Sequence, residues 1–253
     1  MSMTDNIVDV NTYNSKMIKG IDDKLFFTDI VNDYTQVVDF GCANGALLGK
    51  LFKMNENIGL TGYDISKRML SIARLENPEA AYFSDWDDIT VEPNSLLNLS
   101  SVIHEVYAYS TVEEIRMFWK TVFNSGFKYI SIRDMFVSET LEEKYVDTPI
   151  VKKIRSNADW TLASFERMNG SIGVMKYLVH YLLKYTYTDN WERENKENYL
   201  PISSEDIIRI IPDRYEVIHV DHFTLPVLQS NVMKTFGFDL QEKTHMKIIL
   251  KRK

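Results

Sequence analysis

Between residues 25 and 135, short apolar runs alternate with segments whose apolar residues recur at helical spacing. The apolar runs predict strands within 37–40, 57–64, 81–89, 95–107 and 129–134. The segments between them predict helices that begin after Gly45, after Ser66 and at Thr111, where Thr111 and Glu114 form a capping-box pattern. Strands that alternate with helices are typical of an α/β fold with a mostly parallel sheet.

The rest of the chain departs from this alternation and then returns to it. Apolar and aromatic residues at helical spacing predict helices over 159–168 and 172–184. Residues 203–210 and 228–236 predict two further helices, and 215–223 and 246–250 predict a closing antiparallel pair of strands. We therefore expect an arm at 1–24, one sheet domain from 25–135 and 201–253, and a helical insertion, or lid, at 136–200.

The first predicted strand ends in a glycine-bearing turn. Asp39 closes the strand, and Gly41 and Gly45 follow it. Glycine tolerates positive φ and lets backbone approach a ligand closely, and ligands of α/β sheets bind at the carboxyl ends of strands. A dinucleotide fingerprint needs glycine where Ala43 and Ala46 stand, and Asp39 would repel a phosphate. These residues argue against a nicotinamide-dependent oxidoreductase and favour a cationic ligand.

This turn resembles the first motif of the class I S-adenosylmethionine-dependent methyltransferases, D/E-x-G-x-G-x-G. Asp39, Gly41 and Gly45 match the motif, whereas Ala43 replaces its middle glycine. The resemblance covers about residues 25–135. It implies a Rossmann-like methyltransferase fold: a seven-stranded, mostly parallel sheet with an antiparallel last strand and a helical insertion. It also implies S-adenosylmethionine as the cofactor, with the insertion forming the acceptor side.

The resemblance assigns cofactor contacts to residues after each strand. Asp64 would hold the ribose hydroxyls, the role that we favour over that of a plain turn residue, and Ile65 would pack on adenine. Asp85 would accept the adenine amino hydrogen, and the backbone N–H of Trp86 would donate to the ring. The remaining predicted cofactor positions are Cys42, Ala43 and Gly45 in the turn, Met69 on the following helix, and Ser100 and Ser101 after the fourth strand.

His104 is the candidate catalytic residue, because imidazole titrates near neutral pH and the fourth strand ends beside it. It would act as a general base, or else as a structural histidine that packs on the following helix; the sequence leaves both open. Glu105 would orient this loop. Arg133 and Asp134, at the end of the fifth strand, would line the acceptor pocket or form a structural ion pair.

Composition narrows the range of functions. The chain has 253 residues, a net charge of −7 and no 18-residue apolar run, so we expect no membrane span. Cys42 is the only cysteine and is compatible with a reducing cytoplasm; we expect it to be a packed side chain rather than a nucleophile. His219 and His222 would point to opposite faces of a strand, and His245 lacks spaced partners, so no metal site is expected.

The acceptor is less well defined than the cofactor. Apart from Lys251–Lys253 the chain has no contiguous basic patch, which weakens the case for a nucleic acid. We therefore expect methyl transfer to an O or N atom of a small molecule. An RNA or other nucleic-acid acceptor and a non-catalytic cofactor-binding scaffold remain the alternatives. The sequence does not indicate the oligomeric state.

Overall fold

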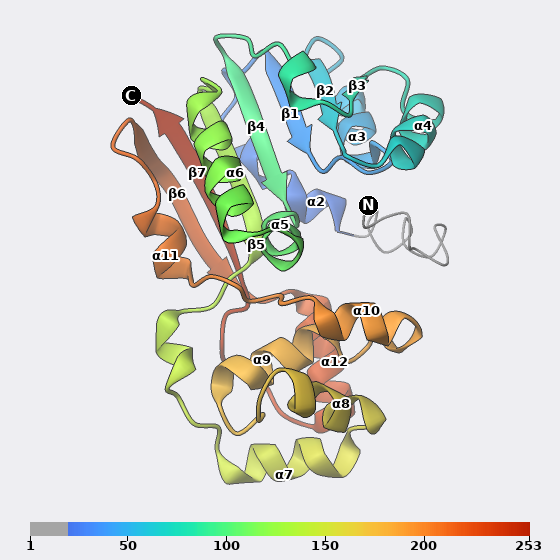
Figure 1. The fold of residues 1–253 in the computed structure, drawn as a ribbon, viewed down its shortest axis with the longest axis vertical. Coiled ribbons are helices and arrows are strands. Elements are labelled where there is room, and N and C mark those ends of the chain that lie inside the picture. The colour runs from blue at the N-terminus through green and yellow to red at the C-terminus, as the bar shows by residue number, and fades with distance from the viewer. Residues whose placement is uncertain (1–19) are drawn as a thin grey trace.

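The computed structural model describes residues 20–253, so most of the predicted arm, residues 1–19, lies outside the described part. A single seven-stranded sheet runs through the upper part of the molecule (Figure 1). Its strands are β1 Gln36–Phe40, β2 Gly59–Tyr63, β3 Ala81–Phe83, β4 Ser95–Ser100, β5 Tyr129–Met135, β6 Tyr215–Phe223 and β7 His245–Arg252. Their order is β3-β2-β1-β4-β5-β7-β6.

The direction of the strands confirms the predicted fold class. Strands β1 to β5 pair in parallel, and only β7 runs antiparallel to its neighbours β5 and β6. Phe40 at the end of β1 is level with Tyr63 of β2 and Leu99 of β4. The carboxyl ends of the three central strands therefore meet at one edge, where the order reverses on either side of β1 and where ligands of such sheets bind.

Helices cover the sheet and form a second, helical lobe below it (Figure 1). The helices are α2 Ile21–Lys24, α3 Ala46–Met54, α4 Lys67–Glu76, α5 Ile103–Tyr109, α6 Val112–Asn124, α7 Thr148–Asn157, α8 Trp160–Met168, α9 Met175–Lys184, α10 Trp191–Lys196, α11 Ser204–Arg209 and α12 Pro226–Phe236. Short 3₁₀ helices lie at Phe26–Asp29, Trp86–Asp88, Glu139–Glu142 and Thr188–Asn190. Within residues 20–253, none of the helices combines the length and apolarity that crossing a membrane requires.

The sheet is buried on both faces, as a parallel sheet requires. Val37 of β1 packs in a cluster with α2, α3 and α4, whereas its neighbour Val38 packs with α5 and α6. Leu96 and Leu97 of β4 divide between the same two clusters. This alternation follows from the two-residue period of a strand, which sends successive side chains to opposite faces. It also fixes which way Asp39 and Asp134 point.

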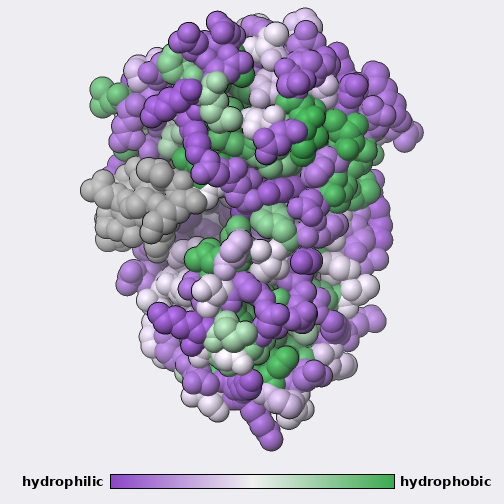
Figure 2. All heavy atoms as spheres, turned by 180° about the vertical axis from the view of Figure 1, so that it is seen from behind, coloured by the Kyte–Doolittle hydropathy of each residue, from purple (hydrophilic) through white to green (hydrophobic). Residues whose placement is uncertain are grey.

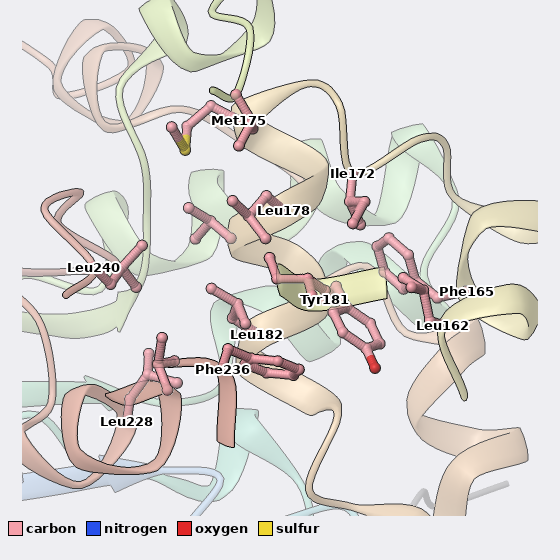
Figure 3. Close-up of a cluster of buried hydrophobic side chains, with 14 of the residues drawn as sticks. Leu162, Phe165, Ile172, Met175, Leu178, Tyr181, Leu182, Leu228, Phe236 and Leu240 are labelled. Atoms are coloured by element: carbon pink, nitrogen blue, oxygen red, sulfur yellow. The ribbon is translucent and has the colours of Figure 1, made fainter. Parts of the chain in front are cut away.

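The helical lobe has its own hydrophobic core, centred on α9. Figure 3 shows Tyr181 facing Phe165 of α8, while Leu182 lies beside Leu228 and Phe236 of α12. The last of these helices comes from the C-terminal part of the chain. The predicted boundary assigned all of 201–253 to the sheet domain, whereas the structure adds α12 to the helical lobe.

Two helices of this lobe, α7 and α10, were not predicted. Pro149 stands in the first turn of α7 and polar residues fill most of its surface, so only Ile154 is fully buried. The helix α10 has six residues and buries Trp191, Glu194 and Asn195. Such short, mostly polar helices carry too few apolar positions for a period to be detected. Their packing on α8 and α12 decides their structure instead.

The outer strand β6 is the exposed edge of the sheet. Figure 2 shows a mostly hydrophilic back surface, with hydrophobic residues gathered on the upper lobe at the side where β6 lies. Val217, Ile218 and Val220 of this strand are each exposed by about two fifths. The strand is kinked by a bulge between Val217 and His219, a feature that commonly blunts exposed sheet edges.

Gly45 tests how tightly the turn after β1 is packed. It has φ 74°, and a Cβ there would overlap the hydroxyl of Tyr82, whereas Gly237 has φ 68° with open space around it. Gly237→Ala should lower the free energy of unfolding by about 1–2 kcal/mol, which is the cost of holding an alanine in the left-handed region. Gly45→Ala should lower the free energy of unfolding by roughly 1–3 kcal/mol more than Gly237→Ala, because the new methyl group overlaps Tyr82. Urea unfolding of both variants measures the difference; equal losses would show that Tyr82 yields without cost.

Candidate active site

The turn after β1 is a backbone cradle with three residues in the left-handed region. Gly41, Ala43 and Gly45 have φ of 75°, 47° and 74°. A Cβ on Gly41 would lie 3.0 Å from Val102, so the chain passes close to the end of β4 here. Ala43 therefore stands in a conformation that glycine adopts more readily than alanine. Its backbone strain is of the order of 1–2 kcal/mol.

Asp64 locks this turn to the next strand. Its carboxylate accepts hydrogen bonds from the backbone N–H of Ala43 at 2.9 Å and of Ser66 at 2.8 Å. Ser66 in turn caps helix α4, since its hydroxyl accepts from the N–H of Met69. The second acid of the motif thus shapes the turn and the start of α4, and a ribose contact by Asp64 stays a prediction.

Asp39 is the buried acid beneath the turn. It is about 95% buried and accepts a hydrogen bond of 2.8 Å from the amide Nδ2 of Asn98 on β4. Burial raises the pKa of Asp39 to about 6, against the opposing effects of the Asn98 hydrogen bond and the positive charge of Lys24. The carbonyl oxygen of Asn98 has no hydrogen-bond partner among the described residues.

A small crevice of about 30 Å³ opens over this turn. Five of the predicted cofactor positions line it: Asp39, Gly41, Cys42, Ala43 and Ser100. Burial raises the pKa of the Cys42 thiol well above its usual range, so it stays protonated, in agreement with the packing role expected for it. The hydroxyl of Ser100 is buried and unbonded among the described residues.

The other predicted cofactor positions lie away from the crevice lining. Ile65 is 55% exposed, and Asp85 uses its carboxylate to cap the 3₁₀ helix at Trp86–Asp88. The ring of Trp86 packs at 5.4 Å from Phe40 and 5.3 Å from Tyr63. Met69 is fully buried in the first turn of α4, and Gly45 sits at the start of α3. Their cofactor contacts remain predictions.

His104 and Asp134 form a buried pair at the ends of β4 and β5. The imidazole Nδ1 lies 2.8 Å from Asp134 Oδ1, while Asp134 Oδ2 accepts from the backbone N–H of Ile103 at 2.7 Å. The sequence placed His104 in a loop, whereas it stands in the first turn of helix α5. Asp134 does not pair with Arg133. The guanidinium of Arg133 instead binds the carboxylate of Asp23 in helix α2 at 2.7 Å.

Each member of the pair shifts the pKa of the other. Burial alone would lower the pKa of His104, but the Asp134 carboxylate outweighs it and raises that pKa above 6.5. Burial alone would raise the pKa of Asp134, but the charge and hydrogen bond of His104 lower it to about 2. The pair is therefore an ion pair below the pKa of His104, and above it the ring is a neutral base held in one orientation.

A second, larger cavity lies beside the crevice, between the sheet and the helical lobe. Its volume is about 570 Å³. His104, Glu105, Arg133 and Met135 line it from the sheet, and the other lining residues include Leu182, Leu183, Asp189, Arg193, Glu194, Glu197, Tyr199, Leu225, Val227, Leu228, Asn231 and His245. Lys24 lines both hollows, and Ser101 lines the cavity next to Ser100 in the crevice. The two hollows are therefore neighbours.

Several of these residues were not anticipated. Lys24 of α2, Arg193 of α10 and Tyr199 come from segments far from the motif in sequence, and no pattern in their neighbourhood marks them. Burial lowers the pKa of Lys24 to about 8, with Arg133 adding to the effect and the Asp39 carboxylate opposing it. Only the folded structure shows that Lys24 lines both the crevice and the large cavity.

The described residues hold no cluster of histidine, cysteine or carboxylate side chains suited to a metal ion. His245 is buried on β7, its Nδ1 2.7 Å from the hydroxyl of Thr244, and burial lowers its pKa to about 3. The ring of His219 lies 6.0 Å from that of Phe26.

Comparison with known proteins shows which family the residues of this turn and its strands resemble. Residues 32–96, which span β1 to the first part of β4, match the family model described as a methyltransferase domain. The chain has the class I methyltransferase fold. The resemblance drawn from Asp39, Gly41 and Gly45 is thereby confirmed.

Among curated proteins the chain is similar to a ubiquinone biosynthesis O-methyltransferase of Colwellia psychrerythraea, with 30% identity over 89 residues. The match spans 35% of this chain and about a third, 33%, of the relative's length. The chain thus matches only about a third of this relative's length, and the likeness concerns the matched part alone.

Solved structures extend the likeness of fold to nearly the whole chain. An S-adenosylmethionine-dependent methyltransferase from Anabaena variabilis has a TM-score of 0.52 at 16% identity, over 92% of this chain and 83% of that one. Magnesium protoporphyrin IX methyltransferase from Synechocystis PCC 6803, solved with bound SAH, has a TM-score of 0.51 at 14% identity, over 98% and 90%. The plantazolicin methyltransferase, also solved with SAH, has a TM-score of 0.51 at 13%, over 96% and 87%.

Asp134→Asn tests the buried ion pair through stability. The pKa of Asp134 falls from 3.8 to about 2 on folding, which corresponds to roughly 2 kcal/mol of stability at neutral pH. This contribution of Asp134 to the free energy of unfolding is present above about pH 4 and is lost as the pH falls toward 2. The pKa of His104 is raised on folding, so its contribution to the free energy of unfolding is present below pH 6.5. This contribution is lost as the pH rises through the pKa of His104 in the folded protein.

Urea unfolding of wild type and Asp134→Asn across pH 2–9 should therefore give the largest difference between about pH 4 and 6.5. The difference should shrink on either side of this window. A difference that does not change with pH would mean that the pair contributes through packing alone.

Proposed function

We propose that the chain is an S-adenosylmethionine-dependent methyltransferase that transfers a methyl group to an O or N atom of a small molecule. One observation carries the proposal: the crevice over the β1 turn adjoins a cavity whose wall holds the His104–Asp134 pair. A methyl donor that lies over the β1 turn, with its charged groups at the crevice, and an acceptor in the cavity would meet at Ser100 and Ser101. The family match over residues 32–96 supports the cofactor.

The charges of the crevice suit the donor. Asp39 offers a carboxylate to the ammonium group of the methionine part, and Lys24 offers an ammonium to its carboxylate. The donor is thus matched by a buried acid and a buried base of opposite sign. A pyrophosphate would find Asp39 in its way, which is the physical reason for preferring a sulfonium donor over a dinucleotide.

Methyl transfer is an in-line displacement. The acceptor O or N attacks the methyl carbon, the carbon–sulfur bond breaks, and its electron pair stays on sulfur, which becomes a neutral thioether. Alignment of the two reactants can contribute roughly 7–11 kcal/mol of barrier reduction. A hydroxyl loses its proton as the new bond forms, because its oxygen would otherwise become positive. An ammonium must lose a proton before it reacts, because only the neutral amine has an electron pair with which to attack.

His104 is placed to take that proton. Its Nδ1 is committed to Asp134, which leaves Nε2 without a hydrogen bond among the described residues, and the ring lines the cavity. Asp134 is a positioning residue: it fixes the tautomer and stabilises the imidazolium that forms, as the orienting acid does in other acid–base sites. General-base assistance of this kind contributes about 10²–10⁴-fold.

A small acceptor fits the space that the structure provides. A cavity of about 570 Å³ is within the usual range for small-molecule sites. The similar Colwellia protein is named an O-methyltransferase of ubiquinone biosynthesis, and the Synechocystis structure is a magnesium protoporphyrin IX methyltransferase. Both act in small-molecule chemistry by their names, which supports the same class of acceptor here.

Calorimetric titration with S-adenosylhomocysteine, the demethylated product, tests the cofactor half of the proposal. We expect binding that weakens as the pH falls through about 6, because Asp39 loses the charge that attracts the ligand's ammonium group. Asp39→Asn should bind roughly tenfold less tightly at pH 8, and its affinity should no longer change near pH 6. NAD should not bind; binding of NAD with no binding of the sulfur compound would overturn the cofactor assignment.

Transfer of a radiolabelled methyl group tests the activity itself. We expect label from S-adenosylmethionine to appear in a pool of small metabolites and not in RNA. The rate should rise with pH through the raised pKa of His104, because only the neutral ring accepts a proton. His104→Gln should be slower by about 10²–10⁴-fold.

Asp134→Asn provides the more specific readout. It should lower the pKa seen in the rate profile as well as the rate, since the carboxylate that raises it is gone. A purely structural His104 would leave the profile unmoved. Label found in RNA would identify the nucleic-acid alternative, and cofactor binding without any label transfer would identify a scaffold.

A further inference from the structure

The large cavity has two walls of different chemistry. Apolar side chains from the helical lobe form one wall: Leu182, Leu183, Leu225, Val227 and Leu228, with Met135 beside them. Charged side chains from α2, α5, β5 and the segment around α10 form the other. An acceptor that fills the cavity therefore has an apolar body and a polar or charged end, and the balance of charge on the second wall decides which charge that end carries.

The cations of this wall already have carboxylate partners. Arg133 lies 2.7 Å from Asp23, and Arg193 lies 2.9 Å from Glu197, a side chain that is only 2% exposed. Lys24 is attracted by several carboxylates, that of Asp39 foremost. Arg133 and Arg193 could bind an acceptor anion only by giving up an existing partner, and Lys24 is already assigned to the carboxylate of the methyl donor in the proposed function.

Of the four carboxylates that line the cavity, Asp189 is exposed to solvent, and Glu105 is the partly buried one with the weakest pairing. Glu194 accepts the hydroxyl hydrogen of Tyr199, and Glu197 accepts that of Tyr109 at 2.6 Å. Glu105, in contrast, accepts no hydrogen bond from residues 20–253, and its nearest cation is Arg193 at 3.8 Å. Its side chain is 23% exposed and lines the cavity.

The surroundings of Glu105 make an added cation favourable. Burial raises its pKa to about 7, while His104 opposes the shift and the negative charge of Glu197 adds to it. A carboxylate removed from water without a full set of partners gains when a ligand supplies a charged hydrogen-bond donor. Glu105 also follows His104 directly in the first turn of α5, so a group held by Glu105 sits next to the candidate base.

We propose that Glu105 is a specificity-determining residue that selects acceptors carrying a cationic amine. The inference rests on the proposed function and narrows its substrate class. The acceptor is then an amphipathic amine: an apolar body against α9 and α12, an ammonium group on Glu105, and a hydroxyl or second amine at His104.

Three phenols of matched shape test the charge preference: tyramine, which is cationic, 4-ethylphenol, which is neutral, and 3-(4-hydroxyphenyl)propanoate, which is anionic. Their binding to the full chain saturated with S-adenosylhomocysteine is measured by calorimetry at pH 8, where Glu105 is mostly ionised. We expect tyramine to bind about tenfold or more tightly than 4-ethylphenol, and the anion to bind most weakly.

Glu105→Gln removes the charge and keeps the shape of the side chain, so it should abolish the preference for tyramine. Because Glu105 also contacts Arg193 of the helical lobe, Tyr109→Phe is the matched control: it removes another contact between α5 and that lobe, the hydrogen bond to Glu197, without changing any charge. Glu113→Gln, on the exposed face of α6, controls for loss of a remote carboxylate. Both controls should keep the preference.

The outcomes separate this inference from the function on which it rests. Loss of the preference in Glu105→Gln alone supports it. It is overturned if tyramine binds no more tightly than 4-ethylphenol, including the case in which neither binds, or if Glu105→Gln retains the preference. Absence of S-adenosylhomocysteine binding would instead overturn the proposed function, and that titration is done first on the same preparation.

Discussion

A single buried carboxylate, that of Asp134, joins the end of β5 to the start of α5. It accepts the imidazole Nδ1–H of His104 and the backbone N–H groups of Ile103 and Met135. Charge-assisted hydrogen bonds of this kind are stronger than neutral ones, and they satisfy the first amide of a helix that has no side-chain cap of its own. The position of His104 on the lining of the large cavity depends on this carboxylate.

The same arrangement repeats across the carboxyl edge of the sheet. Asp39 ends β1 and holds Asn98 of β4, while Asp64 follows β2 and holds the amides of the turn. Each acid is buried, and each has polar partners that offset the cost of burial. These acids therefore pin the turns in place, and Asp39 also gives the crevice a carboxylate beside the ammonium of Lys24.

The sequence predicted the sheet and its edge because both follow from local patterns. Each strand is a short apolar run, and the glycine turn has a fixed spacing to Asp39, so the strands and five crevice residues were identified before folding was considered. The partners of those residues were not: Asp134 was weighed as a partner of Arg133, yet successive strand residues face opposite sides, which sends one to His104 and the other to Asp23. Lys24 and Glu105 acquire their roles only from neighbours distant in sequence.

The helical lobe shows where sequence order and structure diverge most. It is built from 137–200 together with the stretch 225–240, whose Leu228, Val232 and Phe236 complete the core around α9. The chain therefore enters and leaves this lobe twice, at the ends of β5 and α10 and again between β6 and β7. The two stretches bury their apolar faces against each other in one core. The lining residues Leu225, Val227 and Leu228 therefore stand on a connection that leaves the sheet at β6 and returns to it at β7, which ties this part of the cavity to the sheet.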